Sequence, residues 1–175
     1  MKRLLLLLLL SGCVQAPQVE PLRLCIDSAP PSAPWLSPTI AGTPARWSIQ
    51  GVQLVQLVGD DCEAEIRWVD ERPWDDDAVL YSEAVLQLNL SLNGGAGSST
   101  HYANIYRDGW ARGAARSNLD HQVGHLLCVG HDDGVMRDTV PRGDWSHDDT
   151  ITGATLLDAL ACRELGYVGP PGSIQ

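Results

Sequence analysis

The chain has 175 residues, the size of one ordinary domain, with 44% apolar and 19% charged residues. That balance is typical of a folded globular protein and excludes a disordered one. Twelve basic residues against 22 acidic ones give a net charge of −10. A surface this acidic repels phosphate backbones, so nucleic acid is excluded as a partner.

Residues 1–12 predict an export signal. Lys2 and Arg3 precede an unbroken leucine run over residues 4–10, which is shorter than the about 20 residues that a transmembrane helix needs. The run leads into Ser, Gly and Cys13, an ending that resembles the bacterial lipobox, in which the Cys is lipidated and becomes the mature N-terminus. An ordinary secretory signal is the alternative, and in both cases the domain is exported.

The expected location is the bacterial cell envelope, with a lipid anchor as the only contact with the membrane. Val14, rather than Asp, follows Cys13, which by resemblance suggests sorting to the outer membrane. Residues 13–21 hold two prolines and three polar side chains, so they are interpreted as the lipidated Cys and a tether. Residues 22–175 follow as one domain.

The first half of that domain predicts two strands and a helix. Residues 22–26 and 64–69 read as strands, and residues 29–38, with four prolines, read as a loop. Residues 45–58 predict a helix from loosely spaced apolar side chains, although Gly51 weakens it. The acidic residues 70–77 predict a loop.

The second half predicts two strands and two helices. Leu86, Leu88, Leu90 and Leu92 alternate with polar residues, the strict period of two expected of a half-exposed strand. A Gly/Ser-rich turn, a strand over 102–106, a helix over 111–127, an irregular stretch over 130–144 and a helix over 150–165 follow. This order of elements fits an α+β or α/β layered fold.

Export changes how the remaining cysteines are interpreted. Cys25, Cys62, Cys128 and Cys162 would lie in an oxidising compartment, where four cysteines suggest two disulfides. Three connectivities are possible. The chain has no C-x-x-C pair, which argues against a thiol-redox motif.

Three of the five histidines fall within eleven residues. His121 and His125 are four apart on a predicted helix, so both imidazoles lie on one face and can hold a single ion. His131 can reach the same ion if the helix ends and the chain turns back, for which Gly130 is a plausible break. Three neutral imidazoles with an open fourth position indicate a catalytic type of zinc site. His101 and His147 are isolated and are interpreted as surface residues.

The stretch from His121 to His131 resembles the metzincin signature H-E-x-x-H-x-x-G-x-x-H, and Met136 resembles the methionine of the Met-turn that lies under the zinc. Asp132 and Asp133, and the helix over 150–165, fit the matrixin-like branch. The resemblance implies a zinc metallopeptidase of α+β class, with a mixed twisted sheet, an active-site helix and a C-terminal helix. It also implies a monomer with peptide substrates, which would pair with an edge strand over 85–92.

Gln122 is the first departure from that signature, since the family has Glu there. The Glu is the general base that takes a proton from the zinc-bound water and passes it to the leaving amine. A Gln can hydrogen-bond the water but cannot accept its proton, so hydrolysis should be impaired or lost. Asp120 points about 200° away around the helix, which leaves Asp132 or Asp133 as the alternative base.

Cys128 is the second departure, because it replaces the Gly that lets the chain turn at the end of the helix. The active-site and C-terminal helices pack together in the family, so the resemblance favours a disulfide between Cys128 and Cys162. Cys25 and Cys62 would then join neighbouring strands or their ends. The alternative makes Cys128 a fourth metal ligand.

The remaining features carry less information. Tyr106 or Tyr167 could polarise a substrate carbonyl, residues 140–143 could line the cleft, and the acidic residues 75–77 could bind calcium. Two classes of function remain open. One is a lipid-anchored zinc metallopeptidase-like protein, either a pseudoenzyme or a slow enzyme. The other is a non-enzymatic envelope lipoprotein with an empty site, which serves as a binding or structural module.

Overall fold

The structure, a computed structural model, describes residues 19–70, 82–89, 98–110, 114–137 and 150–168. Its strands are β1 (Leu22–Ile26), β2 (Ser48–Ile49), β3 (Val52–Gln53), β4 (Val55–Leu57), β5 (Ala64–Val69), β6 (Ser82–Asn89) and β7 (Ser98–Tyr106). Its helices are α1 (Leu36–Ala41), α2 (Thr43–Arg46), α3 (Arg107–Trp110), α4 (Ala114–Leu126), the 3-10 turn η1 (Gly134–Met136) and α5 (Gly153–Glu164).

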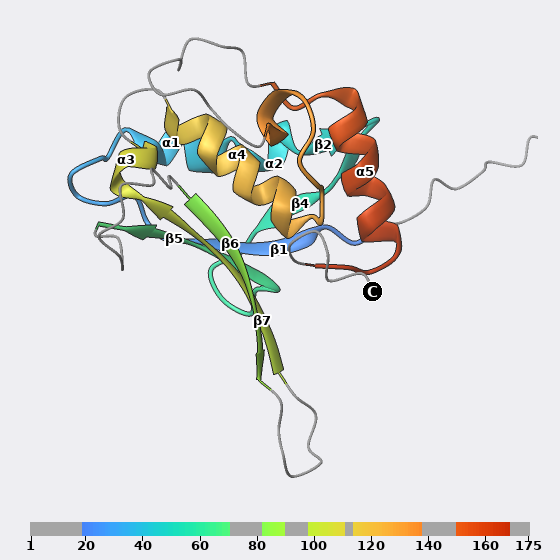
Figure 1. The fold of residues 1–175 in the computed structure, drawn as a ribbon, viewed down its shortest axis with the longest axis horizontal. Coiled ribbons are helices and arrows are strands. Elements are labelled where there is room, and N and C mark those ends of the chain that lie inside the picture. Colours follow the sequence, from blue (N-terminus) through green and yellow to red (C-terminus); the bar gives the residue numbers. More distant parts are fainter. Residues whose placement is uncertain (1–18, 71–81, 90–97, 111–113, 138–149, 169–175) are drawn as a thin grey trace, which may run out of the picture.

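Five of the described strands form one mixed sheet in the order β4-β1-β5-β7-β6. The pairs β1–β4, β1–β5 and β5–β7 are parallel, whereas β6 pairs antiparallel with β7 and lies at the edge. The helices gather on one side of this sheet (Figure 1). The expected α+β class is therefore confirmed, and the strand predicted over 85–92 is found over 82–89, with residues 90–92 outside the described part.

The helix predicted over residues 45–58 is wrong. Only α2 reaches into that range, and the rest forms the hairpin of β2 and β3 followed by β4. Gln50 and Gly51, at the tip of the hairpin, both have positive φ (50° and 83°). Two such residues make the mirror-image turn that suits a two-residue hairpin, so the glycine marks a reversal of the chain. The proline-rich segment over 29–38 is likewise not all loop, because α1 begins at Leu36.

The core lies between the sheet and α4. Alternate residues of the strands point to the same face, and those facing the helices, such as Leu24, Ile66 and Ile105, are fully buried. Leu119 and Leu126 of α4 are fully buried with them. This packing fixes α4 against the sheet and leaves its opposite side for polar side chains.

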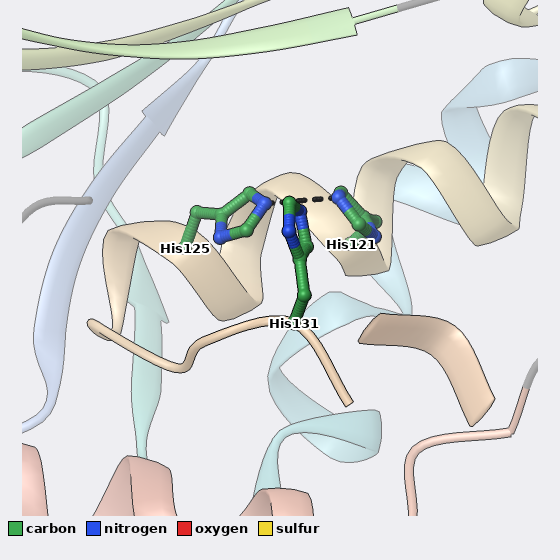
Figure 2. A group of neighbouring side chains, drawn as sticks. All are labelled: His121, His125 and His131. Carbon is green, nitrogen blue, oxygen red and sulfur yellow. Dashed lines mark hydrogen bonds between the residues drawn. The ribbon is translucent and has the colours of Figure 1, made fainter. Parts of the chain in front are cut away.

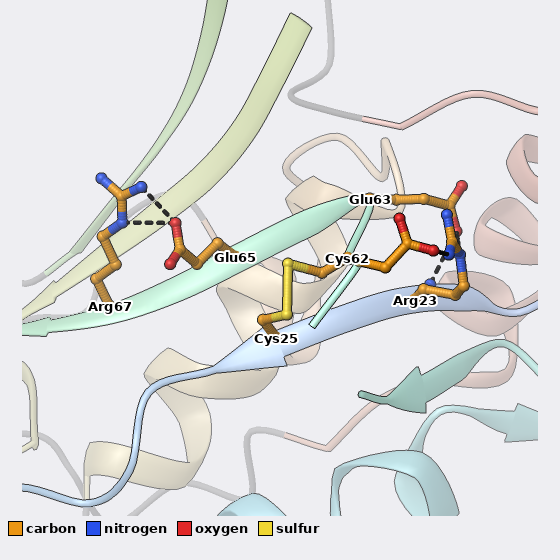
Figure 3. The surroundings of a disulfide bond; sticks show 7 residues. Arg23, Cys25, Cys62, Glu63, Glu65 and Arg67 are labelled. Carbon is orange, nitrogen blue, oxygen red and sulfur yellow. Dashed lines mark hydrogen bonds and ion pairs between the residues drawn. A yellow bond between two sulfur atoms is a disulfide. The ribbon is translucent and has the colours of Figure 1, made fainter. Parts of the chain in front are cut away.

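Two disulfides tie the described elements together. Cys25 of β1 bonds Cys62, just before β5, with Cα atoms 5.6 Å apart (Figure 3). Cys128, just after α4, bonds Cys162 of α5, with Cα atoms 6.2 Å apart. These are the two pairs that the metzincin resemblance favours, and the second excludes Cys128 as a metal ligand.

Several predicted features lie outside the described residues. They are the export signal with Cys13, the acidic residues 75–77, the loop over 140–143 and His147. Among the described helices, none is both long and apolar enough to cross a membrane.

Candidate metal centre

Three histidines converge beside α4. His121 and His125 project from one face of the helix, and His131 reaches them from the chain that follows it (Figure 2). One ligand nitrogen from each ring can be chosen so that all three lie within 4.8 Å of one another. His125 is buried, His121 is half-buried and His131 is exposed, so the group opens to solvent on the His131 side. These residues can hold one metal ion.

Backbone carbonyls orient the two helical ligands. The Nδ1 atom of His121 lies 2.8 Å from the carbonyl oxygen of Val135, and the Nδ1 atom of His125 lies 3.1 Å from that of Val129. A carbonyl can only accept, so each Nδ1 donates and each Nε2 carries the lone pair of the neutral ring. Metal-binding histidines in proteins use this arrangement, with the second nitrogen held by an acceptor.

The donor set fits a zinc ion. The Nε2 atoms of His121 and His125 are 2.9 Å apart, and two lone pairs facing each other at that distance require a proton or a cation between them. Two nitrogens bound tetrahedrally to zinc at 2.0–2.1 Å lie roughly 3.3 Å apart, so a small opening of the rings accommodates the ion. The ring centroid of His131 is 5.4 Å from that of His121 and 4.8 Å from that of His125.

Met136 packs directly against the helix that bears two of the ligands. Its side chain is fully buried, and a Cβ atom added to Gly124 would lie 2.2 Å from its sulfur. The turn η1 that carries it begins at Gly134, whose φ is 70° and whose added Cβ would meet the Thr150 carbonyl at 2.7 Å. A glycine is therefore required at each position, one for close approach and one for conformation.

Gln122 lies next to the ligands on α4, roughly 60° around the helix from His125, and its side chain is buried at 2% exposure. Asp120 points elsewhere, as predicted. Its carboxylate accepts three hydrogen bonds of 2.8–3.0 Å from the guanidinium of Arg46. Burial raises the pKa of Asp120, although Arg46 opposes the rise.

The other candidate bases and ligands lie apart from the three histidines. Asp132 and Asp133 are exposed, and no described carboxylate belongs to the group that can hold a metal. His101 lies on β7, outside that group, and burial lowers its pKa.

The two tyrosines considered as groups that polarise a substrate carbonyl, Tyr106 and Tyr167, each take part in a hydrogen bond within the protein. Tyr106 is buried and its hydroxyl donates to Glu83 over 2.5 Å. Burial and this carboxylate raise the pKa of Tyr106 to about 12. Tyr167 lies beyond the end of α5, where its carbonyl oxygen accepts from Arg163 at 3.3 Å.

Sequence reasoning missed the groups that hold the ligands in place. The carbonyl oxygens of Val129 and Val135 leave no signal in residue types, because every residue has a carbonyl. Gly124, between the two helical histidines, was a usable signal, since a glycine inside a helix often marks a close approach.

The fold and the site together define an α+β protein with a mixed sheet and three histidines that can hold a metal ion. Comparisons with protein families, with curated proteins and with solved structures found no match.

Proposed function

We propose that this protein is an exported, lipid-anchored zinc protein of metzincin type, in which peptide hydrolysis is impaired or lost because Gln122 replaces the general base. The convergence of His121, His125 and His131 carries the proposal. The proposal is supported by the backbone carbonyls of Val135 and Val129, which orient the rings of His121 and His125.

Two further features support the metzincin type. Met136 lies directly against the helix that bears two of the ligands, which is the place that the Met-turn has in that family. The antiparallel strand β6 lies at the edge of the sheet, where the family binds extended substrates. A peptide segment is accordingly the proposed substrate or ligand.

Zinc held by the three histidines would supply a Lewis acid that polarises a peptide carbonyl and lowers the pKa of water. The role proposed for Gln122, which is on α4 three residues before His125, is to hydrogen-bond a molecule bound near that ligand. Its amide cannot take up a proton at neutral pH, so it can orient a water but cannot serve as a general base. Such a site would bind a peptide but would hydrolyse it slowly or not at all.

The proposed setting follows from the sequence features outside the described residues. Residues 1–12 would direct export and Cys13 would carry the lipid. The net charge of −10 argues against nucleic acid as a partner. The proposed form is a monomer on the outer membrane.

Zinc content of the purified protein tests the proposal. We expect about one zinc per chain after purification without chelators, and its loss in His125→Ala, because His125 is the most buried of the three ligands. His101→Ala is the matched control: it removes a histidine outside the metal group and should keep the metal.

Metal analysis by mass spectrometry, with circular dichroism to verify folding, distinguishes the outcomes. A folded parent that neither contains zinc nor takes it up on titration would overturn the proposal. The second class of function, a binding or structural module with an empty site, would then be favoured.

A further inference from the structure

The C-terminal turn of α4 has a specific hydrogen-bond pattern. The N–H of Val129 donates to the carbonyl of Gly124, and the N–H of Cys128 donates to that of His125, both at 2.9 Å. These two bonds define the Schellman motif, in which the residue just past the helix adopts the left-handed conformation. Here that residue is Cys128, with φ of 54°.

This turn determines where a metal ligand points. The same Val129 that closes the motif through its N–H offers its carbonyl oxygen to Nδ1 of His125 at 3.1 Å. If the left-handed turn unwinds, that carbonyl moves away and the imidazole of His125 loses its orientation. The chain from the turn to His131 would lose its direction as well.

A cysteine is a poor choice for this conformation. Left-handed backbone crowds a Cβ atom, so glycine is the usual residue at this place in the motif. Cys128 is held there by its bond to Cys162, a residue of α5 that is only 5% exposed. The crosslink therefore joins a strained position to a buried anchor on another helix.

We propose that the Cys128–Cys162 disulfide is a positioning element of the metal site. It holds the left-handed turn after α4, and through the Val129 carbonyl it fixes the ring of His125 for the metal. This role rests on the proposed metal site. The cysteines are not members of the group that can hold a metal, so they act through the turn.

The Cys25–Cys62 disulfide offers a matched comparison within the same chain. It joins β1 to the short segment that precedes β5. The charged side chains of Arg23, Glu63 and Glu65 lie around it (Figure 3). Its loss should destabilise the fold in a similar way without reaching the turn after α4.

Three double variants of the exported protein test the role. Cys128→Ala/Cys162→Ala keeps a Cβ atom at the strained position and removes the bond. Cys128→Gly/Cys162→Ala removes the bond but supplies a residue that adopts the turn freely. Cys25→Ala/Cys62→Ala removes the other disulfide.

Zinc affinity, measured by competition with a chromogenic chelator, is the first readout. We expect the alanine pair at 128 and 162 to bind zinc about tenfold more weakly than the parent, a factor that corresponds to about 1.4 kcal/mol. The glycine pair should recover parental affinity to within a factor of about three, and the pair at 25 and 62 should match the parent.

Two outcomes would overturn the proposal: an alanine pair that binds as tightly as the parent, or a folded glycine pair that binds as weakly as the alanine pair. If the alanine pair does not fold, the folded glycine pair is compared with the parent, and a zinc affinity about tenfold below the parental one would overturn the proposal. Rescue by glycine is not expected of a crosslink that only adds stability.

A metal-free readout keeps this test separate from the proposed function. In ¹⁵N spectra of the imidazoles without metal, we expect His125 to be protonated at Nδ1 in the parent and in the glycine pair, and to show mixed tautomers in the alanine pair. Failure of the parent to bind zinc would sink the metal function alone. Identical tautomers in all three proteins would sink the positioning role.

Discussion

At position 122, a single functional group separates the proposed zinc site from the metzincin signature. Gln122 has an amide nitrogen where a glutamate would have a second carboxylate oxygen, at nearly the same volume and in a buried position. The substitution leaves hydrogen bonding possible but removes proton transfer. Gln122 is not one of the three candidate ligands, so metal binding and catalysis should be separable at this residue.

Gln122→Glu should therefore raise peptidase activity. A positioned general base is worth about 10²–10⁴ in rate, and we expect a gain within that range on an unstructured peptide substrate. The assay compares turnover by equal amounts of zinc-loaded parent and variant. The double variant Gln122→Glu/His125→Ala is the control for contaminating peptidases and should be inactive. A folded, zinc-loaded variant with no gain over the parent would contradict the role assigned to position 122.

Gly124 shows how closely Met136 packs against the helix that carries His121 and His125. Gly124→Ala places a methyl group 2.2 Å from the sulfur of Met136 and 3.3 Å from the ring of Trp47, both fully buried side chains. Overpacking of this kind costs about 1–3 kcal/mol. We expect urea unfolding to show a loss of stability in that range.

Gly153→Ala provides the comparison for that variant. Gly153 begins α5, and an added Cβ atom there meets nothing within 4 Å. An alanine in an open helical position is neutral or slightly stabilising. Equal effects of the two substitutions would show that the contact between Gly124 and Met136 does not constrain the turn.

At the scale of elements, α4 is fastened on three sides. Its apolar face packs against the sheet, its glycine receives Met136, and Asp120 binds Arg46 at the end of α2. The carboxylate of Asp120 is 1% exposed and the side chain of Arg46 is 16% exposed, so this ion pair is shielded from water. The histidines project from the side that remains.

Breaking the ion pair between Asp120 and Arg46 should lower the free energy of unfolding markedly, because both side chains are largely shielded from water. Asp120→Ala leaves the charge of Arg46 partly buried without its partner, a change that typically costs about 3–5 kcal/mol. Chemical denaturation should show a fall in the free energy of unfolding of that order.

Asp70→Ala is the control for the ion pair. Asp70 pairs with Arg107 at 3.2 Å, but both side chains are about 60% exposed or more, and exposed pairs contribute about 0–1 kcal/mol. Similar losses for the two variants would mean that the Asp120 pair is solvated in solution and does not anchor α4.

At the scale of the whole molecule, sequence patterns succeeded where one local rule decided the outcome. The spacing of His121 and His125 places both on one helical face, and the alternation through Leu86 and Leu88 indicates a strand. The prediction for residues 45–58 failed because the spacing of their apolar side chains fits both a helix and a pair of strands. Only the turn at Gln50 and Gly51 distinguishes the two structures. The pairing of strands far apart in sequence, and the carbonyls beside the histidines, depend on tertiary contacts that residue types do not encode.

The order of strands in the sheet also sets the order in which the molecule can be assembled. A chain is made from its N-terminus, yet β1 cannot gain its neighbours until β4 and β5 exist, and β5 waits for β7. The helix that carries His121 and His125 follows β7, and Cys162 comes later still. During synthesis the three histidines therefore emerge after all the described strands of the sheet on which α4 packs.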